Sequence, residues 1–374
     1  HGRILIMQEG KKTGIKTVFF AKRLEKVREV MSKHRLDGLL LTTIDNVRWL
    51  SGFTGSTGTV FIAAGRAYFL TDSRYTIQAS EETRGFVVKE FSNILEGIIK
   101  IAKRLMIERL GFERRGILYQ EYLNLRSALR NTKLVSLGAD LEEIRARKDK
   151  AEIGFLSQAI RIASSSFRQI SEEIVPGASE KGLALELEIS LRRNGSGSLP
   201  FEVIVASGPH AALPHARPTD RRIKRGECVI VDFGASFKGY QSDTTRTFIA
   251  GRPSRRAISV YQAVKSAHDR AIEGIRPGTS AKEADGIARS FLKKRGLGKF
   301  FRHGLGHGVG LNVHEEPLLS PQSESRIEEG TVVTVEPGVY IPGWGGVRIE
   351  DMVMVKGSGC EVLTGSMEIQ DYGH

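Results

Sequence analysis

The second part of the chain repeats itself, and this repeat constrains the fold more than any other feature. The segment IVPGASEKGLALELEISLRRNG, starting at Ile174, matches IRPGTSAKEADGIARSFLKKRG, which starts 101 residues later at Ile275. Each copy predicts a Pro-Gly turn, a serine that caps a helix, and an amphipathic helix ended by glycine. A second pair, GECVIVDFG at 226–234 and GTVVTVEPG at 330–338, lies 104 residues apart. Two matches in the same order indicate duplicated halves, each with helices followed by strands.

Both matched strands end at a carboxylate, Asp232 in the first and Glu336 in the second. A buried charge at the end of a β-branched strand is costly unless something compensates it, and a metal ion would do so. A second acid follows each strand, Asp243 after 11 residues and Glu350 after 14. The repeat pairs Asp232 with Glu336 and Asp243 with Glu350, so two pseudosymmetric halves would bring all four together. Because four carboxylates repel one another, this arrangement predicts two divalent cations.

One histidine completes the predicted metal site. Residues 303–315 read HGLGHGVGLNVHE, and their alternating glycines would let the backbone pass close to a bound group. His307, in the middle, has no counterpart in the first half, so the two metals would be inequivalent. Such a site suits Mn²⁺, Co²⁺ or Fe²⁺, and a water shared by two metals would attack a carbonyl. We expect His215 and His314 to stabilise an oxyanion or move a proton, with His303 as a further candidate.

The first part of the chain predicts a smaller α/β domain over residues 19–140, without a catalytic constellation. We expect helices over 21–33 and 93–112. The strands expected there cover residues 38–41, 59–64, 67–70, 86–91 and 134–137. A charged segment ends this domain, and we assign residues 148–370 to the catalytic domain.

Composition excludes several classes of protein. The net charge of +13 can indicate a polyanion partner, but basic residues are interleaved with glutamates and no run of five like charges occurs. We therefore expect no nucleic-acid partner. No segment approaches about 18 consecutive apolar residues, so no membrane span is expected. The apolar run at 4–7 is too short for a secretion signal. We expect Cys228 and Cys360 to be buried thiols in a cytoplasmic protein.

Five motifs resemble those of the pita-bread metallopeptidases, which include Xaa-Pro aminopeptidases, prolidases and methionine aminopeptidases. They are LPHARPTD, VDFGASFKGYQSDTTRTF, HGLGHGVGLNVHEEP, VEPGVY and GVRIEDM. In the first part, DGLLLTTIDNVRWLSGFTGSTG and FLTDSRY are similar to the creatinase/prolidase N-terminal domain, which methionine aminopeptidases usually lack. The resemblance implies an α+β protein: a pita-bread catalytic domain of pseudo-twofold duplicated halves, preceded by a smaller α/β domain.

The resemblance also implies a role for each residue of the predicted site. The metal ligands of the family match Asp232, Asp243, His307, Glu336 and Glu350. Among them Asp243 and Glu350 would bridge the two metals, and Glu336 would also take the proton of the attacking water. The histidines that contact substrate and stabilise the transition state match His215 and His314. The pocket on the proline side matches His303, Tyr340 and Arg348.

The function that this resemblance implies is hydrolysis of the bond before a proline in the second position of a peptide. We expect two divalent cations, Mn²⁺ first and Co²⁺, Fe²⁺ or Zn²⁺ as alternatives, in a homodimer. An Xaa-Pro aminopeptidase ranks slightly ahead of an Xaa-Pro dipeptidase (prolidase), because a dipeptidase needs a group that binds the proline carboxylate and the sequence does not identify one. A non-enzymatic binding protein on the same fold is a remote alternative, since all five ligand positions are intact.

Overall fold

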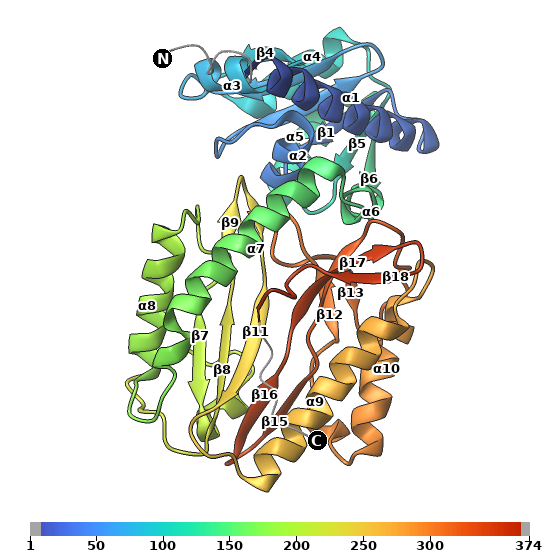
Figure 1. Ribbon diagram of the computed structural model, residues 1–374. Helices are drawn as coiled ribbons and strands as arrows, with labels where there is room; N and C mark the ends of the chain where they lie inside the picture. The colour runs from blue at the N-terminus through green and yellow to red at the C-terminus, as the bar shows by residue number, and fades with distance from the viewer. Residues whose placement is uncertain (1–8, 368–374) are drawn as a thin grey trace, which may run out of the picture. The chain divides into compact units, whose positions relative to one another are not determined.

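The computed structural model describes residues 9–367, with side chains from residue 20 onward, so the apolar run at 4–7 lies outside the described residues. The chain divides into two compact units between Ile144 and Arg145 (Figure 1). The domain limits 19–140 and 148–370 stay predictions, because the ends of these ranges reach beyond the residues whose side chains are described.

The first unit is built on a six-stranded mixed sheet in the order β4-β3-β2-β1-β5-β6. Its strands are β1 (Gly38–Leu41), β2 (Thr59–Ala63), β3 (Ala67–Thr71), β4 (Val87–Glu90), β5 (Arg109–Glu113) and β6 (Lys133–Leu137). Its helices are α1 (Glu9–Lys33), α2 (Ile44–Ser51), α3 (Thr76–Glu82), α4 (Ile94–Arg104) and α5 (Tyr119–Ala128), and α6 (Asp140–Ala146) follows at the boundary. Central strands β1, β2 and β3 are buried on both faces, which explains their continuous apolar runs.

The predicted helix over 93–112 is wrong in its second half. Helix α4 ends at Arg104, and Met106 then takes a positive φ of 52° that no α-helix continues through. Residues Arg109–Glu113 form β5 instead, where Leu110 and Phe112 are buried and the strand runs parallel to β1. A short apolar run after a helix carries no periodicity that separates strand from helix, so only the pairing with β1 decides this segment.

The second unit contains the two duplicated halves. The first half consists of α7 (Lys150–Ile170), α8 (Glu180–Arg193), β7 (Ile204–Ser207), β8 (Cys228–Phe233), β9 (Ser236–Phe237), β10 (Tyr240–Gln241) and β11 (Thr244–Ile249). The second half consists of α9 (Arg255–Gly274), α10 (Ala281–Lys294), β12 (Gly306–Gly308), β13 (Glu315–Leu319), β14 (Val332–Val335), β15 (Gly338–Ile341), β16 (Gly345–Arg348), β17 (Asp351–Lys356) and β18 (Gly359–Val362). Short 3-10 helices are η1 (Ser171–Glu173), η2 (Gly208–Ala212) and η3 (Gly298–Phe300).

The repeat predicted from sequence is confirmed at its helices. Ser179 caps α8 by accepting a hydrogen bond from Gly182 N, and Ser280 caps α10 by accepting one from Glu283 N. Each serine also forms an isolated bridge to an arginine, Ser179 to Arg222 and Ser280 to Arg326. The same local structure therefore occurs twice, as the matching segments predict.

Each pair of helices packs against the strands of its own half. The sheets run in the orders β11-β8-β7 and β13-β12-β14-β17-β18, and β15 and β16 form a separate antiparallel pair. In Figure 1, α7 and α8 (green) lie along the first sheet, and α9 and α10 (orange) lie along the second. Apolar residues from α9, α10 and the second sheet form one core, which includes Val264, Leu292 and Val353. This core holds the strands that carry half of the predicted site.

Two further predictions from the sequence concern membrane-spanning helices and the two cysteines. Among the described helices, none combines the length and apolar character that crossing a membrane requires. Both cysteines are free thiols. Cys228 is buried in β8, as predicted, whereas Cys360 is only half-buried because β18 is an edge strand of its sheet.

Candidate metal centre

In the first half, a hairpin of β8 and β11 positions two acids. Asp232 is the penultimate residue of β8 and lies opposite Thr245 in the antiparallel register. Asp243 immediately precedes β11, two residues before Thr245. Because alternate residues of an extended chain point to the same side, Asp243 and Thr245 face the same way.

In the second half, β14 and β17 position the other two acids in a different register. Val335 lies opposite Asp351, so the next step outward brings Glu336 opposite Glu350. The first hairpin differs, because Asp232 there lies opposite Thr245 and Asp243 lies two residues before that partner. The pairing of Asp243 with Glu350 across the two halves stays a prediction.

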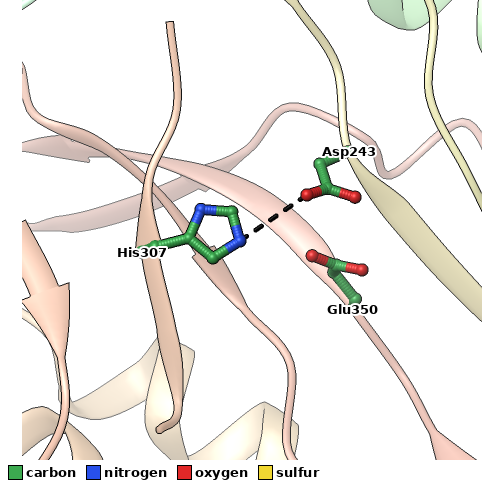
Figure 2. Close-up of side chains that lie close together, drawn as sticks. All are labelled: Asp243, His307 and Glu350. Carbon is green, nitrogen blue, oxygen red and sulfur yellow. Dashed lines mark ion pairs between the residues drawn. The ribbon is translucent and has the colours of Figure 1, made fainter. Parts of the chain in front are cut away.

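The structure brings Asp243, His307 and Glu350 together, as Figure 2 shows. One ligand atom from each lies within 4.8 Å of the others, and all three residues are buried. His307 Nε2 lies 3.6 Å from Asp243 Oδ2 and 3.3 Å from Glu336 Oε1. Asp232 lines the same cleft from β8, the other strand of the first hairpin. Four carboxylates and one imidazole therefore converge there.

Glycines determine how His307 on β12 enters this cluster. A Cβ on Gly306 would lie 2.0 Å from Thr334 O, and one on Gly308 would lie 2.2 Å from Glu316 O, so neither position admits a side chain. His307 Nδ1 lies 3.0 Å from Gly308 O and donates to it, because a carbonyl can only accept. Nε2 consequently faces the carboxylates, in the position from which a neutral ring could bind a cation held among them.

The charges of the cluster test whether the residues fit a cation. Burial, followed by the charge of Asp232, raises the pKa of Asp243 well above its usual range. Burial and the charge of Asp243 have the same effect on the pKa of Glu350. In addition, Asp232 Oδ1 is buried and accepts no hydrogen bond from the described residues. Crowded buried carboxylates with an unpartnered oxygen are the donor set that a divalent cation satisfies.

Glu336 and His307 form an ion pair within the cluster. Burial opposes ionisation of Glu336, but the hydrogen bond and charge of His307, aided by His303 and Arg348, lower its pKa to about 2. Burial likewise opposes the charge on His307, yet Glu336 and Asp243 raise its pKa to about 9. The imidazolium thus occupies the position of a cation among the acids.

Beside the acids, three side chains form a chain of hydrogen bonds with one direction. His303 Nδ1 donates to Gly304 O at 2.7 Å, so its Nε2 accepts from the Tyr340 hydroxyl at 2.9 Å. The hydroxyl in turn accepts from Arg348 Nη1 at 2.8 Å. Burial lowers the pKa of His303, in agreement with a neutral ring, and raises the pKa of Tyr340 to about 12. Arg348 Nη2 donates to Asp232 Oδ2 at 2.6 Å and links this chain to the acids.

Thr245 is a site residue that sequence reasoning missed. Its hydroxyl donates to Glu350 Oε2 at 2.6 Å and accepts from Arg348 Nε at 2.9 Å. The side chain is fully buried. The available signal was its spacing, since Thr245 lies two residues after Asp243 and therefore on the same side of the strand.

All ten residues predicted from the sequence line one cleft of about 500 Å³, which is within the range of small-molecule sites. His314 lies next to the acids, with its ring 4.3 Å from that of His307, and burial lowers its pKa. His215 lines the cleft from the exposed loop after η2. The location of these residues is thus established, while their individual roles stay predictions.

Comparison with known proteins finds related proteins for both units of the chain. The family described as metallopeptidase family M24 matches residues 155–357, and the creatinase/prolidase N-terminal domain matches residues 23–147. An Xaa-Pro dipeptidase of Pyrococcus furiosus is 36% identical over 346 residues, which cover 91% of this chain and 97% of that protein. These matches span both units of the structure.

Two solved structures are similar in fold as well as in sequence. An Xaa-Pro dipeptidase from Bacillus anthracis has a TM-score of 0.89 at 39% identity, covering 94% of this chain and 99% of the other. An X-Pro aminopeptidase from Thermotoga maritima has a TM-score of 0.84 at 35% identity, covering 91% and 96%. The predicted fold, a pita-bread catalytic domain after a smaller N-terminal domain, is confirmed.

Proposed function

The chain belongs to metallopeptidase family M24, and on this premise we propose that it is an Xaa-Pro dipeptidase. Its substrate would be a dipeptide with proline in the second position, and the products would be the first amino acid and free proline. Proline needs a dedicated enzyme because its tertiary amide has no N–H and its φ is locked.

The observation that carries the proposal is the buried cluster of Asp243, His307 and Glu350 in a cleft of about 500 Å³. Several relatives that this chain matches over nearly their full length are named Xaa-Pro dipeptidase or prolidase, and they support the assignment as a dipeptidase. Their names favour it over the aminopeptidase that sequence reasoning ranked slightly ahead. The aminopeptidase is the second candidate, since one similar structure is that of an X-Pro aminopeptidase.

We assign the five converging side chains to two divalent cations. Asp232, Asp243, His307, Glu336 and Glu350 would hold them, and the oxygen-rich set keeps Mn²⁺ as our first expectation. The chemistry supplied by such cations is polarisation of the scissile carbonyl and activation of water for attack on it.

The chain's own residues would move protons and orient the substrate. Glu336, whose pKa is lowered to about 2, is ionised at neutral pH and can accept the proton of the attacking water. The lowered pKa of His314 keeps its ring neutral beside the acids, so an N–H of the ring can donate to the developing oxyanion. The hydrogen bonds among His303, Tyr340 and Arg348 keep the proline side of the cleft rigid.

A substrate comparison tests the proposal. The full chain loaded with Mn²⁺ is assayed on Ala-Pro, Ala-Pro-Ala and Met-Ala-Ser. Cleavage of Ala-Pro alone supports the dipeptidase, and preferred cleavage of Ala-Pro-Ala supports the aminopeptidase. Preference for Met-Ala-Ser, or cleavage of none of them, would overturn the assignment to Xaa-Pro peptides.

Asp243→Asn tests the metal assignment, because it keeps the shape of the side chain and removes its charge from the centre of the cluster. We expect hydrolysis of Ala-Pro to fall by about 100-fold or more, since losing even an outer hydrogen-bond partner of a metal ligand costs roughly 10- to 100-fold. Bound Mn²⁺, measured by mass spectrometry of the metal, should fall as well. Glu186→Ala, an exposed acid on α8, is the matched control. Full activity of Asp243→Asn would contradict the two-metal centre.

A further inference from the structure

A dipeptidase must bind the terminal carboxylate of its substrate close to the scissile bond, whereas an aminopeptidase has no such charge in its site. In Xaa-Pro the carboxylate of proline lies one residue beyond the scissile bond, whereas a longer peptide has a neutral amide there. Leaving this carboxylate unpaired in a cleft beside four acidic side chains would be costly. If the proposed function holds, on which this inference rests, a cationic side chain must lie in the cleft.

Besides its histidines, to which the predicted site gives other roles, the cleft offers two such side chains. Among the described residues that line it, Arg348 and Arg217 are the arginines, and no lysine contributes. Arg348 is buried and fully engaged, with donors to Asp232 Oδ2 at 2.6 Å, to Tyr340 Oη at 2.8 Å and to Thr245 Oγ1 at 2.9 Å. A substrate carboxylate would have to break these bonds, so Arg348 serves the site's architecture.

Arg217 is in the opposite situation. Its side chain is 85% exposed, and its recorded partner is Glu202, whose Oε2 lies 3.4 Å from Arg217 Nε. Glu202 is itself 60% exposed. Exposed ion pairs of this kind contribute little to stability, so water or another anion replaces one partner at small cost. Both Nη groups of Arg217 remain available for a planar, two-point contact with a carboxylate.

The loop that carries Arg217 is anchored although the side chain is exposed. Ala216, one residue earlier, is buried in a small core that includes Ile230 of β8 and Tyr340 of β15. Two residues earlier, Pro214 O accepts a hydrogen bond from Arg348 Nη1 at 3.1 Å. The backbone is thus held against the part of the cleft that Tyr340 and Arg348 line, which the proposed function assigns to proline. Only the side chain of Arg217 is free to change its position.

We propose that Arg217 leaves Glu202 to bind the C-terminal carboxylate of the dipeptide, and so selects dipeptides over longer chains. Glu202 keeps the guanidinium at the cleft when no substrate is present, and its carboxylate returns to water when substrate binds. A tripeptide presents no charge at this point and gains nothing from Arg217. Sequence reasoning missed this residue because nothing in the motif LPHARPTD separates a binding arginine from a surface one.

Arg217→Ala tests the proposal through a ratio rather than a single rate. The Mn²⁺-loaded chain is assayed on Ala-Pro and on Ala-Pro amide, which lacks the terminal charge, and kcat/KM for the first is divided by that for the second. We expect this ratio to fall by about 10-fold or more in Arg217→Ala and to recover in part in Arg217→Lys. In Glu202→Gln, which removes the competing anion, the ratio should rise. Arg255→Ala, an exposed arginine at the start of α9, should keep the wild-type ratio.

The outcomes separate this inference from the proposed function. An unchanged ratio in Arg217→Ala, with wild-type cleavage of Ala-Pro intact, would overturn the role of Arg217 and leave the dipeptidase standing. Equal wild-type rates on Ala-Pro and its amide would also overturn it, since no group would then recognise the carboxylate. If the wild-type chain cleaves only Ala-Pro-Ala, the proposed function itself fails.

Discussion

At the scale of single residues, Thr245 shows how an uncharged side chain can organise a cluster of acids. It lies opposite Asp232 in the first hairpin, and its hydroxyl lies between Glu350 and Arg348. A carboxylate there would add a further negative charge to a site where burial and neighbouring acids already raise the pKa of Asp243 and Glu350. The hydroxyl instead connects Glu350 to Arg348 without adding a charge.

Thr245→Val removes this hydroxyl at nearly constant shape. Glu350 Oε2 then loses its donor and Arg348 Nε its acceptor, both in a buried environment. We expect Mn²⁺ affinity to fall by roughly 10- to 100-fold, as for other partners of metal ligands. Calorimetric titration of the metal measures this loss. Thr245→Ser keeps the hydroxyl and should restore most of the affinity, and equal affinity in Thr245→Val and wild type would contradict the role.

At the scale of elements, the start of β13 anchors the loop that holds His314. Glu315, the next residue, contacts Arg145 and accepts from Lys148 Nζ at 3.1 Å. It also accepts from Asn312 N at 3.0 Å, which closes the loop around His314. All three charged side chains are buried, so each depends on the others for compensation.

Glu315 predicts a dependence of stability on pH. Burial alone would raise the pKa of Glu315, but the charges of Lys148 and Arg145 outweigh it and lower the pKa below the usual 4.5. A carboxyl with a lowered pKa stabilises the folded state above its unfolded value and loses this contribution as pH falls through its folded value. At neutral pH, Glu315→Gln should therefore lower the free energy of unfolding by about 3–5 kcal/mol, because it leaves two buried cations uncompensated.

Urea denaturation of wild type and Glu315→Gln at several pH values measures this effect. The difference between them should be largest near pH 7 and should shrink below pH 4.5, where the wild-type carboxyl becomes protonated. A difference that stays constant down to the acid limit of folding would show that Glu315 does not act through its charge.

At the scale of the whole molecule, the two units have separate cores, and the acid cluster belongs entirely to the second. The chain has a net charge of +13, yet five carboxylates line its cleft, four of them in the predicted metal site. The folded second unit therefore concentrates negative charge in one cleft, although the chain as a whole is positively charged. Cations that bind this cluster will favour the folded state over the unfolded one.

Metal removal should consequently lower the thermal stability of the protein. At a free Mn²⁺ concentration of about 100 times Kd, binding to the folded state adds about 2.7 kcal/mol per site. Differential scanning calorimetry with Mn²⁺ and with a chelator should show this as a higher Tm for the loaded protein. Asp243→Asn should lose most of the shift. An equal shift in both proteins would place the stabilising metal elsewhere.

Local patterns of residues were enough to predict several features of this protein. Serine caps and helical periodicity predicted α8 and α10, and the matched segments predicted two halves. Acids at strand ends, with a histidine among glycines, predicted five of the residues that line the cleft. These inferences work because capping, periodicity and the cost of burying charge depend on neighbours in the chain.

Features that depend on pairing between distant segments could be seen only in the folded chain. Register placed Thr245 opposite Asp232 and beside the acids. Pairing with β1 turned the end of a predicted helix into β5. Packing buried Arg348 against Asp232 and left Arg217 exposed, although the sequence around each arginine does not distinguish these outcomes. Backbone hydrogen bonds and burial between remote residues set these outcomes, and no window of sequence contains both partners.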